Sequence, residues 1–285
     1  MEYITKDFVQ NLIKPRKQET NKNHYGRVLA ICGCMGYTGA AYFASQAAVK
    51  TGSGVVTLAV PNAIYHILTG KLNEPVIRPI TCDSNGKFCL DSFDELYELA
   101  SHADCVLIGC GLGRSDELDK LVHKLVLSLS RPIVLDADGI NAFSGHIDLL
   151  SKTKAQIVLT PHNGEFKRLS LLEPTIQNAM NFSQNTNTIV LLKSHRTNVL
   201  NPSKCHFQNT TGNAGMAKGG SGDVLSGIIL SLIGQGLSPF DAACAGAWIH
   251  GKSGDICAEK FGEYSMTPSD MLDNISKVML DIVGC

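Results

Sequence analysis

A glycine-rich loop that leads directly into an apolar run is the part of the sequence best suited to chemistry. Residues 213–223 read Asn-Ala-Gly-Met-Ala-Lys-Gly-Gly-Ser-Gly-Asp, and residues 224–233 continue as Val-Leu-Ser-Gly-Ile-Ile-Leu-Ser-Leu-Ile. A helix that begins at this junction leaves backbone N–H groups unpaired at the positive end of its dipole. Glycines let these groups approach an anion closely, so the sequence predicts a phosphate cradle. Its members are Gly219, Gly220, Ser221 and Gly222.

Asp223 closes this loop. A carboxylate in the first turn of a helix is favourable simply as a cap, and glycine-rich helix starts are common. The loop by itself therefore leaves two interpretations open, a plain capped helix and a phosphate-binding site with an acidic residue beside it.

Composition excludes several other classes of protein. The chain has 285 residues, 44% of them hydrophobic, and a formal net charge of -1, which gives no support to a nucleic-acid or acidic-membrane partner. We expect a single domain over residues 1–285, in which residues 1–25 form a polar arm with a solvated basic cluster at residues 14–22. With no apolar leader or bilayer-length segment, we expect a cytoplasmic protein.

The cysteines do not suggest a metal site. There are 10, but they are scattered and no C-x-x-C pair occurs, so we expect most of them to be small buried residues.

Short apolar segments alternate with helix-like segments along most of the chain. Strands are predicted at residues 27–33, 55–60, 105–109, 132–136, 156–160 and 188–192, with helices at residues 40–50, 92–100, 116–129, 165–172 and 175–185. A hairpin is predicted at residues 198–201 and 205–207, followed by helices at residues 223–236, 239–259 and 267–283. Ser92 and Glu95 have capping-box spacing. This alternation favours a mostly parallel sheet covered on both faces.

In an open parallel sheet, ligands bind beyond the carboxyl ends of the strands. The glycines and polar residues of this chain gather at those positions, in residues 33–41, 109–113, 136–141, 160–165 and 193–197. Any one of these loops could be an ordinary turn, but five in register predict a common site.

These loops carry a family resemblance. Their motifs are Gly-Tyr-Thr-Gly-Ala-Ala at residues 36–41, Gly-Leu-Gly at 111–113, Leu-Asp-Ala-Asp-Gly-Ile-Asn at 135–141, Thr-Pro-His-Asn-Gly-Glu at 160–165, and the loop of residues 213–225. The combination resembles the NAD(P)H-hydrate dehydratase family, a branch of the ribokinase-like fold, from about Gly26 to the last helix. The resemblance implies an α/β protein, a three-layer α/β/α sandwich with a mostly parallel central sheet.

The resemblance also implies a function in nucleotide repair. The expected enzyme is a hydro-lyase that dehydrates the S form of hydrated NADH or NADPH and cleaves ADP or ATP. We expect Mg2+ to take part, the protein to be a homotetramer, and a separate NAD(P)HX epimerase to act beside it. The sequence does not distinguish ADP from ATP or hydrated NADH from hydrated NADPH.

Family roles transfer only to matching positions. The resemblance implies that the hydrated dinucleotide contacts Ala40, Gly113, His162 and Asp223. It implies that the adenine nucleotide contacts Lys193, Ser194, His195, Arg196, Thr197 and Gly222. Two residues depart from the family pattern: Ser194 and Asn23 stand where glycines are usual, so altered nucleotide contacts are expected at both places.

Asp223 is the expected catalytic residue, accepting the proton of the substrate hydroxyl while that hydroxyl is phosphorylated. Because a helix start favours a carboxylate, we expect the pKa of Asp223 to be lowered, so that it orients the hydroxyl and takes the proton late. Asp136 and Asp138 could bind a metal ion, although Asp138 also suits a helix cap, so metal ligands stay unassigned. Trp248 and His250 are expected in the core or at an interface.

Two other functions share these motifs. A small-molecule kinase acting on a vitamin precursor or sugar would use the same loop and Asp223 but release a stable phosphorylated product. A non-catalytic sensor would bind an adenine nucleotide without turnover.

Overall fold

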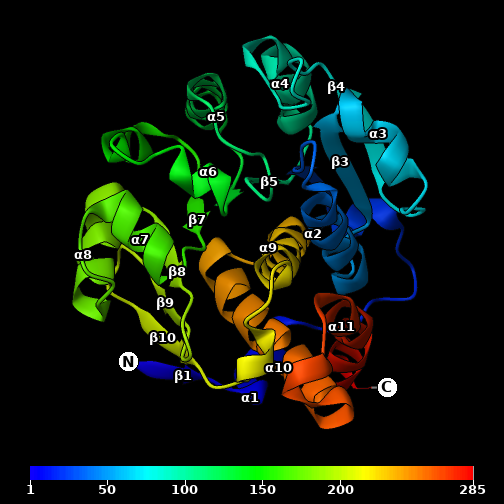
Figure 1. Ribbon diagram of the computed structural model, residues 1–285. Coiled ribbons are helices and arrows are strands. Elements are labelled where there is room, and N and C mark those ends of the chain that lie inside the picture. The colour runs from blue at the N-terminus through cyan, green and yellow to red at the C-terminus, as the bar shows by residue number, and fades with distance from the viewer. Residues whose placement is uncertain (285) are drawn as a thin grey trace.

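A single ten-stranded sheet runs through the protein in a computed structural model that describes residues 1–284 (Figure 1). The strands are β1 Glu2–Ile4, β2 Arg27–Ile31, β3 Val55–Pro61, β4 Val76–Ile80, β5 Cys105–Ile108, β6 Ile133–Leu135, β7 Ile157–Leu159, β8 Ile189–Leu192, β9 Asn198–Leu200 and β10 His206–Asn209. Their order is β1-β10-β9-β8-β7-β6-β5-β2-β3-β4. Strand β9 runs antiparallel to β8 and β10, and the other neighbouring pairs are parallel.

Helices cover both faces of this sheet. They are α1 Lys6–Leu12, α2 Thr38–Thr51, α3 Asn62–Thr69, α4 Phe93–Ser101, α5 Asp116–Ser128, α6 Asp138–Asn141, α7 Asn163–Ser170, α8 Ile176–Thr186, α9 Ser221–Gly234, α10 Pro239–Ser265 and α11 Pro268–Val283. Helices α2, α9, α10 and α11 pack on one face, and α4, α5, α7 and α8 pack on the other (Figure 1).

Strand β2 shows why two faces are needed. Its side chains alternate: Val28 and Ala30 belong to the core under α2 and α9, whereas Leu29 and Ile31 belong to the core under α4 and α5. Apolar residues at every position of a strand therefore bury both sides of the sheet. The predicted three-layer α/β/α architecture and mostly parallel sheet are confirmed.

The predicted elements from β2 onward are present, and most bounds agree within about two residues. The hairpin of β9 and β10 and the Thr267 cap of α11 are also confirmed. Helix α10 continues to Ser265, beyond its predicted end. Helix α3 and strand β4 lie in a stretch for which no element was predicted.

The N-terminal segment differs from the expected polar arm. Strand β1 pairs with β10, and Ile4 and Val9 are completely buried. The ring of Phe8 lies 5.2 Å from that of Phe207. Residues 2–12 thus extend the sheet and its core, and only residues 14–19 and 21–24 form exposed stretches as expected. The apolar pattern of this segment is too short to predict a strand. Its partner strand lies some 200 residues away in the sequence, so no local signal indicates the pairing.

The capping box predicted at Ser92 and Glu95 is wrong. The hydroxyl of Ser92 donates to the Thr81 carbonyl at 2.7 Å, and the Glu95 carboxylate accepts from the Thr81 N–H at 3.2 Å. Both side chains hold the residue after β4, and the Ser92 hydroxyl also accepts from the Cys89 N–H at 3.0 Å. A tertiary contact has replaced the local one that the spacing suggested.

Candidate active site

The glycine loop has a conformation that only glycine tolerates well. Gly220, the cap of α9, has φ 97°, and a Cβ there would lie 2.7 Å from the ring of Phe43. Within residues 1–284 the N–H groups of Gly222 and Asp223 have no protein acceptor. Gly219 is exposed, with no atom within 4 Å of an added Cβ. The start of α9 can therefore receive an anion from solvent.

Long-range contacts hold this loop in place. The Asp255 carboxylate accepts from the Gly212 N–H at 3.1 Å and from the Asn213 amide at 3.0 Å. The Lys218 ammonium donates to the Tyr264 carbonyl at 2.6 Å. Because α10 and its C-terminal end supply these partners, the cradle is part of a preorganised scaffold.

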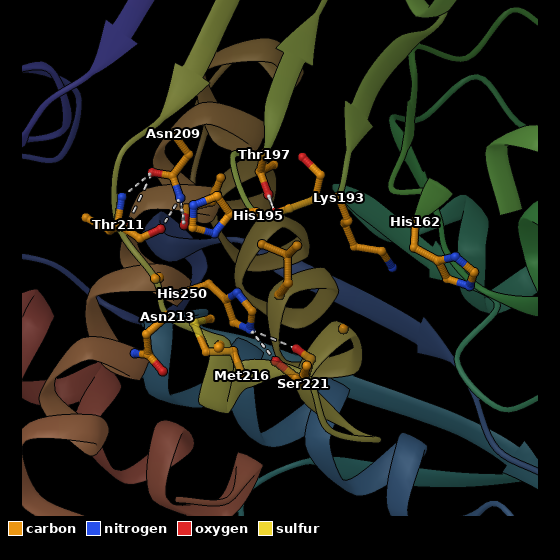
Figure 2. Close-up of a pocket in the computed structure, with 18 of the residues that line it drawn as sticks. His162, Lys193, His195, Thr197, Asn209, Thr211, Asn213, Met216, Ser221 and His250 are labelled. Carbon is orange, nitrogen blue, oxygen red and sulfur yellow. Dashed lines mark hydrogen bonds between the residues drawn. The ribbon is translucent and has the colours of Figure 1, made fainter. Parts of the chain in front are cut away.

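A cavity of about 680 Å³ opens beside the loop (Figure 2). It is lined by the predicted site residues His162, Lys193, Ser194, His195, Thr197, Ser221 and Gly222, and further by Asn209, Thr211, Gly212, Asn213, Ala214, Met216, Ala217, Lys218, Leu225, Ala247, His250 and Gly251. Most of the predicted nucleotide residues therefore share one cavity. Arg196 does not line it, and its guanidinium donates to the Thr210 carbonyl at 3.1 Å.

Lys193 and Asp136 form an ion pair in which Asp136 is buried and the Lys193 side chain, which lines the cavity, is partly exposed. The ammonium of Lys193 lies 2.9 Å from Oδ1 of Asp136, whose carboxylate also accepts from the hydroxyls of Thr160 and Ser226 at 2.8 Å each. Burial opposes the charged form of Asp136, but Lys193 and these donors outweigh it and lower its pKa. The pair therefore stays charged.

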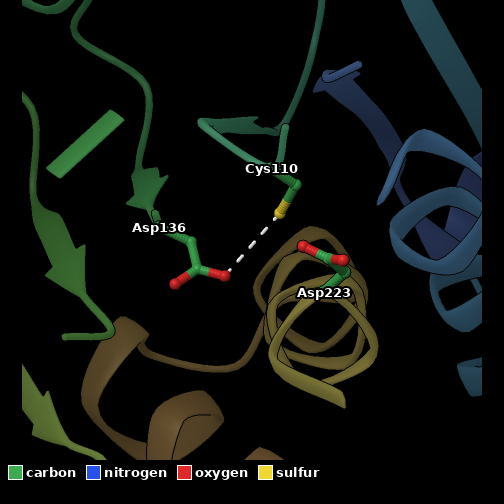
Figure 3. Close-up of side chains that lie close together, drawn as sticks. All are labelled: Cys110, Asp136 and Asp223. Carbon is green, nitrogen blue, oxygen red and sulfur yellow. Dashed lines mark hydrogen bonds between the residues drawn. The ribbon is translucent and has the colours of Figure 1, made fainter. Parts of the chain in front are cut away.

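Asp223, in the first turn of α9, lies near Asp136 and Cys110 (Figure 3). One ligand atom each from Cys110, Asp136 and Asp223 lies within 4.8 Å of the others. Burial, with the charge of Asp136 as the next cause, raises the pKa of Asp223 to about 7. The expectation of a lowered pKa was wrong, because desolvation and neighbouring carboxylates outweigh the helix dipole. Asp223 can therefore act as a base near neutral pH.

The same cluster does not fit a resident Mg2+. It is the one group of at least three candidate ligands within residues 1–284, and it includes a thiol, whereas Mg2+ prefers oxygen. The oxygens of Asp136 already accept from Lys193, Thr160 and Ser226. The side chain of Asp138 accepts from the Gly113 N–H at 2.9 Å.

Ala40 and Gly113 lie outside the large cavity. Ala40 belongs to the first turn of α2, and a Cβ on Gly111 would lie 2.8 Å from its methyl group. Gly113 continues the loop that carries Cys110, which neighbours Asp223. These two residues therefore lie on the side of Asp223 formed by α2 and the loop after β5. The predicted site is divided into two regions, with Asp223 between them.

His162 caps helix α7. The ring Nδ1 of His162 accepts from the Gly164 N–H at 3.0 Å. The backbone N–H of His162 donates to the Glu165 carboxylate at 2.8 Å. The imidazole is nevertheless about half exposed and lines the cavity. Nε2 lies 3.5 Å from Oε1 of Glu165, so the ring caps α7 and also borders the cavity.

Two expectations about single residues need correction. The side-chain oxygen of Asn23 accepts from the Arg27 guanidinium at 2.8 Å. Because Arg27 is the first residue of β2, Asn23 lies at the amino end of the sheet and away from the cavity. Altered nucleotide contacts are therefore not expected there. His250 lines the cavity, although core or interface placement was expected, while Trp248 is buried as predicted.

Sequence reasoning missed the wall of the cavity formed by Asn209, Thr211 and His250. A helical histidine carries no local signal, and the wall exists only where α10 packs beside the β10 segment.

No helix within residues 1–284 is both long and apolar enough to span a bilayer. Most of the cysteines described are buried, as predicted.

Comparison with known proteins gives consistent results. The sequence profile of the NAD(P)H-hydrate dehydratase family matches residues 28–277. The bifunctional NAD(P)H-hydrate repair enzyme Nnr of Moorella thermoacetica is 37% identical, over 98% of this chain and 54% of its own length. The chain thus spans about half the length of the curated relatives it matches.

Solved structures support the fold. A ribokinase-like superfamily protein from Enterococcus faecalis is 27% identical, with a TM-score of 0.88 over 100% of this chain and 97% of its own. The ADP/ATP-dependent NAD(P)H-hydrate dehydratase of Bacillus subtilis, co-crystallised with ATP and Mg2+, is 24% identical, with a TM-score of 0.84 over 99% and 98% of the two chains. The profile match over residues 28–277 establishes that the chain belongs to the NAD(P)H-hydrate dehydratase family.

Proposed function

We propose that this protein dehydrates the S form of hydrated NADH or NADPH and uses ADP or ATP as phosphoryl donor. The observation that carries the proposal is the position of Asp223. Its carboxyl group lies at the start of α9, between the loop of Cys110 and the cavity lined by Gly222 and Lys193. A phosphoryl donor on one side and a hydroxyl acceptor on the other would meet there.

The nucleotide would occupy the cavity. Lys193, Ser194, His195, Thr197 and Gly222 line it, and Arg196 belongs to the same segment. The N–H groups at the start of α9 would stabilise the charge on the transferred phosphoryl group without reorganising during the reaction. The hydrated dinucleotide would lie toward Ala40 and Gly113, with His162 at the rim of the cavity.

The chemistry has two stages. The ring hydroxyl attacks the terminal phosphorus of the nucleotide, the bond from that phosphorus to the leaving AMP or ADP breaks, and Asp223 accepts the hydroxyl proton. The C–O bond then breaks, phosphate leaves with the electron pair, and a proton is lost from the neighbouring ring carbon, which restores the double bond. A base with a pKa of about 7 suits the first stage.

The finer features are also proposals. The Bacillus subtilis dehydratase was crystallised with ATP and Mg2+, and we propose that the nucleotide is used as its Mg2+ complex, with the ion held mainly by phosphate oxygens. The Moorella relative is bifunctional, so an NAD(P)HX epimerase is the expected partner activity. We further propose a single catalytic domain, a cytoplasmic location and a homotetrameric assembly. Light scattering would test the oligomeric state.

One assay tests the function. Purified protein is mixed with hydrated NADH or hydrated NADPH, Mg2+ and either ADP or ATP, and the absorbance of the reduced nicotinamide is followed. Recovery of absorbance together with one phosphate per turnover is expected. A stable phosphorylated product would indicate a small-molecule kinase instead, and nucleotide binding without turnover would indicate a sensor.

A further inference from the structure

Cys110 is a buried thiol beside Asp223 that has no part in the two-stage chemistry. It follows strand β5, and its side chain is completely buried. Its sulfur, one oxygen of Asp136 and one oxygen of Asp223 all lie within 4.8 Å of one another (Figure 3). A side chain with a single proton therefore lies beside two carboxylates.

The backbone on either side of Cys110 is held by close contacts. A Cβ added to Gly109 would overlap the carbonyl oxygen of Asp136. A Cβ added to Gly111 would lie 2.8 Å from the methyl group of Ala40. Because a side chain at either glycine would push the loop away from its neighbours, the two glycines allow the thiol to approach the carboxylates.

The thiol of Cys110 keeps its proton. Contact with Cys32 is the largest cause that raises the pKa of Cys110 well above its ordinary value, followed by burial and by the charges of Asp223 and Asp136. At physiological pH the group is therefore a hydrogen-bond donor and not a thiolate. The sulfur of Cys32 is only a weak acceptor, whereas a carboxylate is a strong one, so the S–H bond is directed to the carboxylates.

Asp136 does not depend on this thiol. Its Oδ2 lies 3.7 Å from the sulfur of Cys110, but Oδ2 also accepts from the Ser226 hydroxyl at 2.8 Å. The other oxygen, Oδ1, accepts from Lys193 at 2.9 Å and from Thr160 at 2.8 Å. Both oxygens of Asp136 thus keep a donor when the thiol proton turns away.

Asp223 has more need of the donor. Burial is the largest cause that raises the pKa of Asp223, and the charges of Asp136 and Asp138 act in the same direction. A hydrogen bond from the Cys110 thiol and the charge of Lys193 act in the opposite direction. Cys110 is thus the neutral side chain that supports the ionised form of Asp223.

We propose that Cys110 is a positioning residue, whose thiol donates to ionised Asp223 and turns to Oδ2 of Asp136 after Asp223 has accepted the substrate proton. Rotation about the Cβ–Sγ bond moves the donor between them. The O–H bond of the substrate breaks, an O–H bond forms on Asp223, and the thiol keeps its own proton. The proposal rests on the proposed function in taking Asp223 as the base, but the hydrogen bond itself can be measured without substrate.

Two substitutions separate the donor from simple packing. Cys110→Ala removes the donor, whereas Cys110→Ser retains one. Cys105→Ala is the matched control, because Cys105 is equally buried at the opposite end of β5. The titration of Asp223 is followed by NMR of the full chain, labelled at its aspartate carboxyl carbons and free of substrate. Loss of a signal in Asp223→Asn assigns the resonance.

In Cys110→Ala the titration midpoint of Asp223 should rise by about 1 pH unit, because a hydrogen bond to a charged group is typically worth at least that much. The kcat/KM for dehydration should then fall about fivefold at pH 7 and stay within about twofold of wild type at pH 9. Cys110→Ser should restore the wild-type profile, and Cys105→Ala should leave it unchanged. Thermal unfolding checks that each variant is folded.

Infrared difference spectra of the wild type give a readout that does not depend on the alanine variant. The S–H stretching band of Cys110, assigned by its loss in Cys110→Ser, should move to lower frequency as Asp223 ionises. In Asp223→Asn the same band should not move over that pH range.

Three outcomes would overturn the proposal. They are an S–H band that does not respond to the ionisation of Asp223, an equal rise of the midpoint in Cys110→Ala and Cys105→Ala, and a loss of kcat/KM by the same factor at every pH with an unchanged midpoint. The last would mean that Cys110 only packs against its neighbours. The expected midpoints and band shift in a wild type that does not dehydrate the substrate would support the hydrogen bond and reject the proposed function.

Discussion

The ammonium of Lys193 and the carboxylate of Asp136 lie 2.9 Å apart, although they follow different strands of the sheet and are 57 residues apart in sequence. Asp136 is 1% exposed. Lys193 lines the cavity, whereas the charge of Asp136 helps to raise the pKa of Asp223, so the pair links the cavity electrostatically to the expected catalytic carboxylate.

Replacing Lys193 with methionine should therefore destabilise the fold as well as the site. The change leaves the buried Asp136 charge unpaired, for which a loss of about 3–5 kcal/mol in the free energy of unfolding is typical. Urea unfolding measures it. The double variant Lys193→Met with Asp136→Asn should recover most of the stability but little nucleotide affinity. An equally unstable double variant would contradict this explanation.

Asp223→Asn should retain the fold and nucleotide binding but lose at least about 100-fold in turnover, because the amide cannot accept the substrate proton. Rates of recovery of the reduced nicotinamide measure this loss. Asp241→Asn, at the start of α10 and outside the cavity, serves as control. A near-normal rate for Asp223→Asn would contradict the assignment of Asp223 as the catalytic base.

The pH dependence of activity should follow Asp223. A base with a pKa of about 7 is deprotonated above neutrality, so kcat/KM should rise through about pH 7 and level off at higher pH. A profile that is flat between pH 5 and 9 would exclude this residue as the base.

The contribution of Asp223 to the free energy of unfolding should fall as the pH rises, whereas the activity rises. The folded pKa of Asp223 lies above its ordinary value of 3.8, so the folded state holds the proton more tightly than the unfolded state. Stability associated with Asp223 is then full below about pH 4 and is lost as the pH rises toward 7. The Asp223→Asn variant should gain more Tm relative to wild type at pH 8 than at pH 4. Equal differences at both pH values would contradict the raised pKa.

Gly220→Ala should weaken nucleotide binding and lower the Tm. The φ of 97° is unfavourable for alanine, and the added methyl group would contact the ring of Phe43. Gly236→Ala is a matched control, because Gly236 also has a positive φ of 100°, has open space around it and lies outside the cavity. Equal effects of the two substitutions on ADP affinity would mean that the conformation of Gly220 does not shape the cradle.

Much of the fold was predictable from the sequence because its signals are local. Uninterrupted apolar runs such as residues 105–108 can only be satisfied by a strand with both faces buried, and the alternation with helices then requires a mostly parallel sheet. The carboxyl ends of parallel strands meet at one edge, which is why the loops that begin at Asp136 and Lys193 could be expected to share a site. The glycine loop before α9 was recognisable from its own residues, although contacts from α10 hold it in place.

Tertiary structure decided what depends on distant neighbours. The short β1 segment becomes a strand only because β10 lies beside it, and His250 becomes a cavity residue only because α10 packs next to the segment after β10. The charge state of Asp223 is the clearest case. The sequence places it at a helix start, which favours ionisation, but burial near Asp136 reverses the direction of its pKa shift. Electrostatic free energy in a protein depends on solvent exclusion and on charges brought together by folding, and neither is encoded in the local sequence.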